Sequence, residues 1–153
     1  MKTYPVERTE EELSELCRRQ GLKATPQRLA IVRELMGTKE HPDAETLYAR
    51  VRQQIPDLSL DTVYRTLATF ERLGLVHRLE TTGSQARYEA LTSPHHHFLC
   101  DRCGKVIDFS WQDFDTLAPP PPPAGAERVE RTSVVLHGQC ADCAQAAAEA
   151  EQG

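Results

Sequence analysis

Two Cys-x-x-Cys pairs constrain this chain more than any other feature. The pairs are Cys100/Cys103 and Cys140/Cys143, and Gly104 directly follows the first of them. A two-residue spacer lets both thiolates of a pair reach one ion, so two pairs supply four soft ligands to a tetrahedral zinc ion with no open position. We therefore predict a structural zinc site whose binding energy becomes folding energy. A redox dithiol and an iron–sulfur cluster are the alternatives, and the second cysteine pair favours zinc over both.

Charge is distributed unevenly along the 153 residues, whose formal net charge is −5. From Cys17 to Arg78, 11 Lys and Arg residues outnumber 7 Asp and Glu residues, a net charge of +4, so the remainder carries −9. Because salt screens surface charges over about 10 Å, the basic part can bind phosphate locally in spite of the overall sign.

Membrane and secretion signals are missing from the sequence. No apolar run is long enough to span a bilayer, and residues 1–15 lack the apolar region of a signal peptide. We therefore expect a cytoplasmic protein with no membrane partner. In that reducing compartment the fifth cysteine, Cys17, lies at helical spacing from Leu13 and Leu16, and we interpret it as a small buried apolar residue.

Four amphipathic helices are predicted in the first half of the chain. Each has an apolar stripe at helical spacing together with a boundary signal, either a capping residue before it or a glycine after it. The first covers Glu10 to Gln20, and the other three begin after the capping residues Thr25, Asp43 and Ser59.

After the fourth helix, the spacing of apolar residues changes from a helical repeat to the alternation of apolar and polar residues that is typical of strands. Leu75 to Glu80 and Ala86 to Ala90 are predicted as two short strands around Thr82-Gly83-Ser84. Four helices followed by a hairpin is the element order of a winged helix, in which the last helix before the hairpin enters the DNA major groove. We therefore assign residues 1–91 to a winged-helix DNA-binding domain.

Residues 92–153 have the pattern of a small mixed domain. A strand from His97 to Phe109, interrupted by the first cysteine pair, precedes a short helix at Trp111 to Leu117 and the five prolines Pro119 to Pro123. Arg128 to Leu136 is rich in β-branched residues and is predicted as a second strand, and Ala144 to Gly153 as a frayed helix. The expected fold class is α+β, with a winged-helix domain followed by an α/β domain that carries a four-cysteine zinc site.

Three consecutive histidines stand directly before the first cysteine pair. On a strand, His95 and His97 would share one face and His96 would point to the other. Glu89, on the preceding strand, and Asp108, just beyond the cysteine pair, are nearby carboxylates. Mixed imidazole and carboxylate donors suit iron, manganese or zinc bound reversibly, so we predict a regulatory metal here. The alternative is a solvated strand end that happens to be rich in histidine.

His41 lies in a loop between two predicted helices and can extend this donor set from the first domain. A metal that joined His41 to the second domain would couple the two domains, because a ligand that binds one arrangement more tightly shifts the population toward it. His77 and His137 lack such neighbours in the sequence, and we interpret both as ordinary strand residues.

The ordered set of motifs resembles the ferric-uptake-regulator superfamily over residues 10 to 143. The segments are GLKATPQRLAIVREL, HPDAETLY, DTVYRTL, HHHFLCDRCGKVIDF and CADC. The resemblance implies a homodimeric repressor, not an enzyme, that binds AT-rich inverted repeats of double-stranded DNA when it holds metal. It also implies that the second domain is the dimerisation domain. The implied cofactors are a structural Zn2+ on the four paired cysteines and a regulatory Fe2+ or Mn2+ on His41, Glu89, His95, His97 and Asp108.

The resemblance also implies three DNA-binding residues. Tyr64 matches a residue that packs against thymine methyl groups, and Arg65 can reach guanine in the major groove. Lys23 matches a basic residue that enters an adjacent narrow minor groove. The alternatives are solvated charges at Arg65 and Lys23 and core packing at Tyr64, although Val63 and Leu67 already define the inward face of that helix.

The predicted donor set resembles the peroxide-sensing branch of the superfamily at some positions and the ferric-uptake type at another. The triple histidine and Asp108 resemble the peroxide-sensing branch, in which ferrous iron reacts with hydrogen peroxide and histidines matching His41 or His95 are oxidised. Glu89 instead resembles the ferric-uptake type. Positions that complete a third metal site in that type hold Pro94, His96 and Thr132 here, so we expect this site to be absent. We favour the peroxide branch; an iron-responsive repressor or a zinc or manganese sensor is the alternative.

The five prolines depart from the family, whose members have a helix between the two strands of the second domain. Proline stops helices, so an extended polyproline segment is expected at Pro119 to Pro123. Two other classes of function compete with a repressor: a metalloenzyme whose open coordination position activates water or oxygen, and a zinc-ribbon interaction module without metal sensing. Metal-dependent affinity for DNA would separate the repressor from both.

Overall fold

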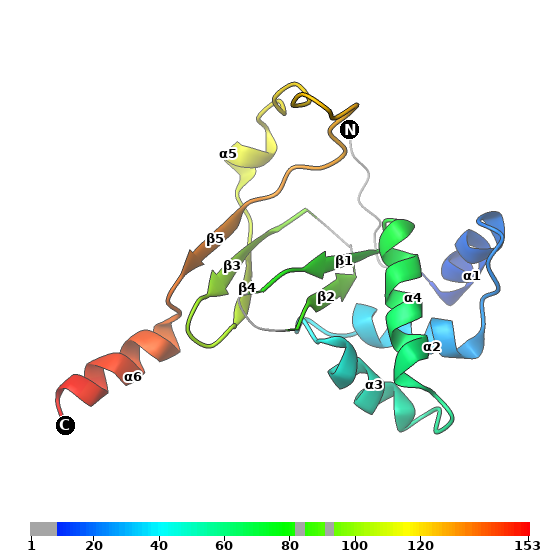
Figure 1. Cartoon of the computed structure of the whole chain (residues 1–153), viewed down its shortest axis with the longest axis horizontal. Helices are drawn as coiled ribbons and strands as arrows, with labels where there is room; N and C mark the ends of the chain where they lie inside the picture. Colours follow the sequence, from blue (N-terminus) through cyan, green and yellow to red (C-terminus); the bar gives the residue numbers. More distant parts are fainter. Residues whose placement is uncertain (1–8, 82–84, 91–93) are drawn as a thin grey trace. The chain divides into compact units, whose positions relative to one another are not determined.

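The computed structural model describes residues 9–81, 85–90 and 94–153, which form two compact units. Unit 1 comprises Met1–Ser93 and unit 2 comprises Pro94–Gly153. Figure 1 shows the elements of both units along the chain. None of the described helices is both long and apolar enough to cross a membrane.

Unit 1 begins with four helices, each with a side-chain cap at its first turn. They are α1 (Glu10–Arg19), α2 (Pro26–Met36), α3 (Ala44–Arg52) and α4 (Leu60–Arg72). The predicted caps are confirmed, because the side chains of Thr25, Asp43 and Ser59 accept hydrogen bonds from backbone N–H groups three residues further on. Thr9 caps α1 in a reciprocal capping box with Glu12.

The hairpin after the helices consists of β1 (Val76–Leu79) and β2 (Arg87–Ala90), which pair antiparallel. Gly74 ends the fourth helix in the left-handed region, at φ 73°, where a side chain would be strained. The predicted turn at Thr82-Gly83-Ser84 lies outside the described residues. Four helices and an antiparallel hairpin, in this order, form a winged helix, as the sequence predicts.

The core of unit 1 comes from the apolar faces of its helices and the inner face of its hairpin. Ile31, Leu47, Val63 and Phe70 are completely buried. Cys17 is also completely buried within this core, which confirms its interpretation as a small apolar residue, and burial raises the pKa of its thiol. Unit 1 is therefore held together by ordinary hydrophobic packing.

Unit 2 is a three-stranded sheet with two helices. Its strands are β3 (His96–Cys100), β4 (Val106–Phe109) and β5 (Val135–Gly138), arranged in the order β4-β3-β5. β3 pairs antiparallel with β4 and parallel with β5. The helices are α5 (Gln112–Asp115) and α6 (Ala141–Glu151), and neither contains a buried residue.

The predicted strand from Arg128 to Leu136 is wrong over most of its length. Strand β5 begins at Val135, which pairs with His97, and continues to Gly138. Four residues of β3, from His97 to Cys100, pair with β5, whereas a β-branched composition by itself supplies no hydrogen-bond partner. Along the preceding exposed stretch Arg128 forms an ion pair with Glu130 at 2.6 Å.

The polyproline segment Pro119–Pro123 is exposed and belongs to neither helix nor strand. Helix α5 accordingly ends at Asp115, ahead of the prolines. The final helix was predicted from Ala144. It begins earlier, at Ala141, and Cys140, the first cysteine of the second pair, is its N-cap residue.

The core of unit 2 is thin within the single chain. Among residues 94–153, Leu99 is the buried apolar side chain besides the cysteines Cys100 and Cys140, and the other buried side chains are His96 and His97. An apolar core of this size contributes little to folding, so unit 2 needs another source of stability.

Candidate metal centres

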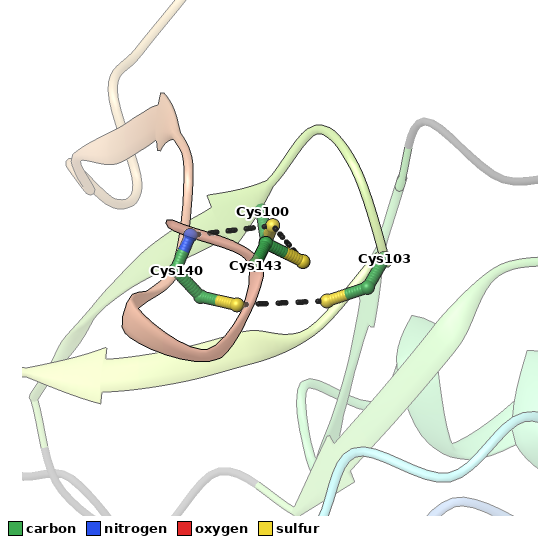
Figure 2. A group of neighbouring side chains, drawn as sticks. All are labelled: Cys100, Cys103, Cys140 and Cys143. Atoms are coloured by element: carbon green, nitrogen blue, oxygen red, sulfur yellow. Dashed lines mark hydrogen bonds between the residues drawn. The ribbon is translucent and has the colours of Figure 1, made fainter. Parts of the chain in front are cut away.

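The four paired cysteines come together at one end of the unit 2 sheet (Figure 2). Cys100 ends β3 and Cys103 lies in the turn that leads to β4, while Cys140 and Cys143 stand at the start of α6. All four Sγ atoms lie within 4.8 Å of one another. The prediction that the two Cys-x-x-Cys pairs converge is confirmed.

The sulfur–sulfur distances match a tetrahedral ion. Cys100 Sγ lies 3.8 Å from Cys143 Sγ, and Cys103 Sγ lies 3.7 Å from Cys140 Sγ. These distances are far longer than the roughly 2 Å of a disulfide. A tetrahedron with zinc–sulfur bonds of about 2.3 Å has edges of about 3.8 Å. The cluster therefore fits a structural zinc ion.

Hydrogen bonds from backbone amides favour the thiolate form of one cysteine of the cluster, and the thiolate is the form that binds metal. The N–H groups of Cys103 and Cys140 hydrogen-bond to Cys100 Sγ and lower the pKa of its thiol to about 6. The opposite shift occurs at Cys143, where hydrogen bonds to the sulfurs of Cys140 and Cys103 raise the pKa to about 12. Zinc binding therefore has to displace protons from the cluster, with Cys100 as the thiolate that is available first.

A lysine lies beside the cysteine cluster. Lys105 Nζ forms a 2.9 Å ion pair with Asp142 Oδ2 and so joins the segment after the first cysteine pair to the second pair. The hydrogen bond to Asp142, followed by its negative charge and those of Cys140 and Cys103, raises the pKa of Lys105. A positive charge here offsets part of the negative charge of four thiolates around one divalent ion.

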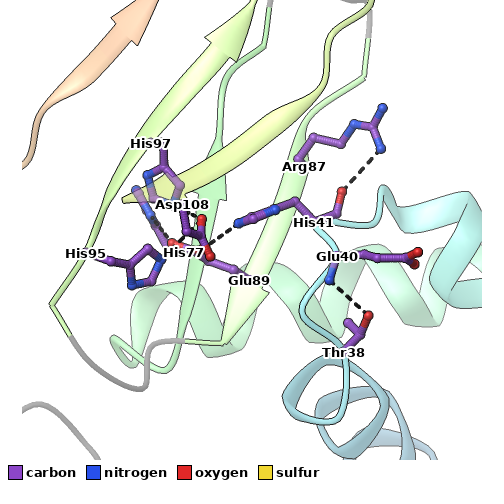
Figure 3. A network of polar contacts seen from close by, with 9 residues as sticks. All are labelled: Thr38, Glu40, His41, His77, Arg87, Glu89, His95, His97 and Asp108. Atoms are coloured by element: carbon purple, nitrogen blue, oxygen red, sulfur yellow. Dashed lines mark hydrogen bonds and ion pairs between the residues drawn. The ribbon is translucent and has the colours of Figure 1, made fainter. Parts of the chain in front are cut away.

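Unit 1 holds two buried candidate metal donors, His41 and Glu89 (Figure 3). His41 Nε2 faces Glu89 Oε2 at 3.1 Å, and both side chains are more than nine-tenths buried. Two neighbouring ligands on a metal with bonds of about 2.1 Å are separated by about 3.0–3.4 Å. The pair therefore has the spacing of two adjacent ligands of one ion.

Strand β2 holds the His41 loop in place as well as carrying Glu89. The Tyr88 N–H donates to the Pro42 carbonyl at 3.0 Å, and Arg87 Nη1 donates to the His41 carbonyl at 3.2 Å (Figure 3). The same loop leads into Asp43, the N-cap of α3. A restraint on His41 therefore acts directly on both the hairpin and α3.

His77 lies in a strand, as predicted, but it has a neighbour that the sequence analysis did not assign to it. It lies on β1 directly opposite Glu89 on β2, and its Nδ1 is 3.1 Å from Glu89 Oε1. The sequence did contain a signal for this contact. If two strands are predicted on either side of a turn at Thr82-Gly83-Ser84, equal counting from the turn pairs position 77 with position 89. Glu89 thus has an imidazole at each carboxylate oxygen.

Unit 2 holds three candidate donors, His95, His97 and Asp108, on one side of its sheet (Figure 3). His97 on β3 is directly opposite Asp108 on β4, with His97 Nε2 3.5 Å and His95 Nε2 3.8 Å from Asp108 Oδ1. The two imidazole rings are 4.8 Å apart. The predictions that His95 and His97 share a face and that the hairpin brings Asp108 toward them are confirmed.

His96 points to the opposite side, as predicted, and both of its ring nitrogens have protein partners. The Val134 N–H donates to Nδ1 at 3.0 Å, so Nε2 carries the proton and donates to Asp115 Oδ1 at 2.9 Å. The buried ring also packs against Phe109 and Phe114, with centroids 5.5 and 5.2 Å away. His96 therefore joins β3, α5 and the segment that enters β5.

The three residues predicted to contact DNA all lie on the surface of unit 1. Tyr64 on α4 is 45% exposed, whereas the neighbouring Val63 and Leu67 are buried. Arg65 is exposed and pairs with Asp61 at 2.9 Å; an exposed pair of this type on a helix is worth only about 0.3–0.5 kcal/mol, so Arg65 can leave it for another partner. Lys23 is exposed in the turn before α2.

Comparisons with known proteins agree with this architecture. A model of the ferric uptake regulator family matches residues 19–120. The peroxide operon regulator of Bacillus subtilis is 31% identical over 134 residues, which cover 88% of this chain and 92% of that protein. The solved structure of the Helicobacter pylori ferric uptake regulator, described as having three functional metal-binding sites, matches with a TM-score of 0.75 at 26% identity and covers 94% of this chain and 97% of that one. The Campylobacter jejuni peroxide stress regulator matches with a TM-score of 0.62 at 28% identity, over 86% of this chain and 99% of that one.

A winged-helix unit, a cluster of four cysteines that fits zinc, and histidine and carboxylate donors that fit iron or manganese define a metal-dependent regulator. The family model covers two thirds of the residues, and the Bacillus subtilis relative is similar over almost its whole length. This chain belongs to the ferric uptake regulator family.

Proposed function

We propose that this protein is a cytoplasmic homodimeric repressor that binds DNA when its regulatory site holds ferrous iron or manganese, and that releases DNA when hydrogen peroxide oxidises a ligand histidine. The observation that carries the proposal is the division of the donors. His41 and Glu89 belong to the unit that reads DNA, whereas His95, His97 and Asp108 belong to the other unit.

One ion held by all five side chains would restrict how the two units can be arranged. If the restricted arrangement is the one that fits DNA, metal binding raises DNA affinity by population shift, in proportion to how much better that arrangement binds the ion. On the DNA-reading side the restraint reaches β2 and α3 through the hydrogen bonds that pin the His41 loop. Imidazole and carboxylate donors leave such an ion exchangeable, which a sensor requires.

Peroxide sensing is favoured by the triple histidine with Asp108 and by the peroxide regulators among the relatives. Bound ferrous iron would activate peroxide next to the ligand imidazoles, with no net change in its own oxidation state, so the two electrons that peroxide takes up come from the imidazole ring. In the net reaction one oxygen atom is added to a ring carbon of His41 or His95, and the second oxygen leaves as water. An oxidised ring is a weaker donor, so the donor set loses affinity for the ion and the repressor loses its active arrangement.

An iron-responsive repressor without peroxide sensing is the second candidate. Glu89 favours it, because the peroxide branch usually has the shorter aspartate at this position, and the Helicobacter pylori ferric uptake regulator has the same overall fold. In that case the same five donors would report the supply of iron alone. A zinc or manganese sensor with these donors remains within the family's range of function.

DNA recognition is assigned to α4 and the turn before α2. Tyr64 would pack against thymine methyl groups and Arg65 would contact guanine in the major groove, while Lys23 would enter the adjacent minor groove. Their exposure supports this assignment, since none of the three is needed to fill the core.

Homodimer formation would cover apolar side chains of unit 2 that are exposed in the single chain. Among the described residues β5 pairs with β3 alone, and Ile107, Trp111 and Leu136 are each at least 40% exposed. An unpaired strand edge beside exposed apolar side chains favours association with another copy. Two-fold symmetry of such a dimer would match an inverted repeat, for which we propose an AT-rich sequence.

The test is the affinity of the zinc-loaded protein for an AT-rich inverted repeat, measured anaerobically with added Fe2+ or Mn2+, before and after hydrogen peroxide. We expect metal-dependent binding in both cases, loss of binding after peroxide with Fe2+ only, and one added oxygen on the His41 or His95 peptide by mass spectrometry. Binding with Fe2+ that survives peroxide would favour the iron-responsive repressor. Binding that does not depend on metal would contradict both candidates and favour a metalloenzyme or a zinc-ribbon module.

A further inference from the structure

We propose that His77 is a positioning residue for the regulatory metal, which holds the Glu89 carboxylate so that its other oxygen faces His41. The proposal rests on the proposed function, in which Glu89 and His41 bind one ion. It assigns a role to a histidine that the metal donor set leaves out.

The contact follows from the strand register of the hairpin. His77 and Glu89 are directly opposite each other on β1 and β2, so their side chains project from the same face of the hairpin. His77 Nδ1 lies 3.1 Å from Glu89 Oε1, and His41 Nε2 lies 3.1 Å from Oε2 (Figure 3). Each oxygen therefore has its own imidazole, and the two imidazoles come from different elements of unit 1.

Glu89 needs this support because of its length. Glutamate has one more rotatable bond than aspartate, so more rotamer freedom is lost when its carboxylate is fixed at a metal. An imidazole N–H that donates to Oε1 fixes the plane of the carboxylate and leaves Oε2 to face His41. Hydrogen bonds of this kind to ligand side chains typically change metal affinity by about 10- to 100-fold.

His77 is better placed to orient the carboxylate than to bind the ion itself. Its Nδ1 faces Oε1, on the other side of the carboxylate from the oxygen that His41 faces. The His77 side chain is 21% exposed, whereas Glu89 is 8% exposed, so the hydrogen bond is largely shielded from competing water.

The chain contains a matched control in His137. Its Nδ1 lies 3.1 Å from Asp101 Oδ1, the same contact at the same distance, but both side chains are about half exposed and neither belongs to the regulatory donor set. Replacing His137 therefore removes an equivalent histidine–carboxylate contact from a β-strand without touching Glu89.

The experiment measures Mn2+ affinity of the zinc-loaded full chain by calorimetry in the absence of DNA, so that the readout does not depend on repression. His77→Val removes the donor and suits a strand, and we expect Mn2+ affinity to fall by about 10- to 100-fold. His77→Asn keeps an N–H near the position of Nδ1 and should retain most of the affinity. His137→Val should bind Mn2+ as the wild type does.

A double-mutant cycle separates positioning from general stability. If His77 acts through Glu89, His77→Val should weaken Mn2+ binding in the wild type but have no further effect in a Glu89→Ala background. Equal losses in both backgrounds would refute the positioning role. So would wild-type affinity in a folded His77→Val protein.

Should His77→Val fail to fold, His77→Asn and His77→Gln replace it in the comparison, because only Asn places its amide where Nδ1 lies. Equal affinities of these two variants would then contradict the proposal. If the wild type itself binds no Mn2+ beyond its zinc, the proposed function fails and the role of His77 fails with it; if the wild type binds and His77→Val binds equally, only the role of His77 fails.

Discussion

Loss of zinc is expected to unfold unit 2 while unit 1 stays folded, because the two units are stabilised in different ways. Burial of Leu99, the one apolar side chain besides cysteine that is buried in unit 2, contributes about 1.5–3 kcal/mol. In zinc-finger peptides near neutral pH, zinc binding contributes about 10–16 kcal/mol to the free energy of folding. Whole domains have a net stability of about 5–15 kcal/mol, so unit 2 cannot lose this contribution and remain folded.

The single tryptophan makes this prediction measurable. Trp111 belongs to unit 2 and packs against Phe114 with ring centroids 5.6 Å apart, so its fluorescence reports on unit 2 alone. In a Cys100→Ser variant we expect the cooperative thermal transition of Trp111 to disappear, while most of the far-UV circular dichroism of α1 to α4 persists. Cys17→Ala leaves the zinc ligands intact and should keep both the zinc and the Trp111 transition. A native Trp111 transition in zinc-free Cys100→Ser protein would refute the reasoning.

Four further substitutions test individual contacts. His41→Ala should abolish metal-induced DNA binding while unit 1 stays folded, since its loop is held through the backbone carbonyls of residues 41 and 42 and Glu89 keeps its contact with His77; normal DNA binding without added metal, measured by anisotropy of labelled DNA, would contradict the switch. Arg65→Ala should reduce discrimination at one base pair by about 1–3 kcal/mol with no change in melting temperature, and unchanged sequence preference would remove Arg65 from the interface. Leu67→Ala should destabilise unit 1 by about 2–5 kcal/mol in urea unfolding, because its side chain is buried; a loss below about 1 kcal/mol would mean that the site collapses around the cavity. Ser59→Ala should cost about 1 kcal/mol through loss of the α4 cap, with Ser110, which caps no described helix, as the control that should change nothing.

Local signals were sufficient to predict the helices of unit 1. Thr25, Asp43 and Ser59 cap helices where the sequence places them, because an N-cap is defined by residues that are neighbours in the chain. The convergence of the cysteine pairs was also predictable, since a Cys-x-x-Cys spacing brings its own two thiolates together and one metal needs both pairs.

Other contacts between distant segments could not be predicted from the sequence patterns. β5 begins at Val135 rather than Arg128 because its limits depend on which residues of β3 are free to pair. The His96–Asp115 hydrogen bond joins residues 19 positions apart, and no periodicity relates them. His77 is intermediate: no partner was predicted for it, although the symmetry of the predicted hairpin places it opposite Glu89. The assignment of five side chains to one regulatory ion stays a prediction.

Strand β3 carries a proposed regulatory donor, His97, and a candidate zinc ligand, Cys100, on one short segment. His97 and Cys100 are three residues apart, a distance of about 10 Å along a strand. Because we expect unit 2 to fold only around zinc, we also expect the sensor donors to take up their register only after zinc has bound. The expected order of metal loading is therefore zinc first and the sensor metal second. A cell short of zinc would accumulate chains that cannot respond to iron, however much iron it contains.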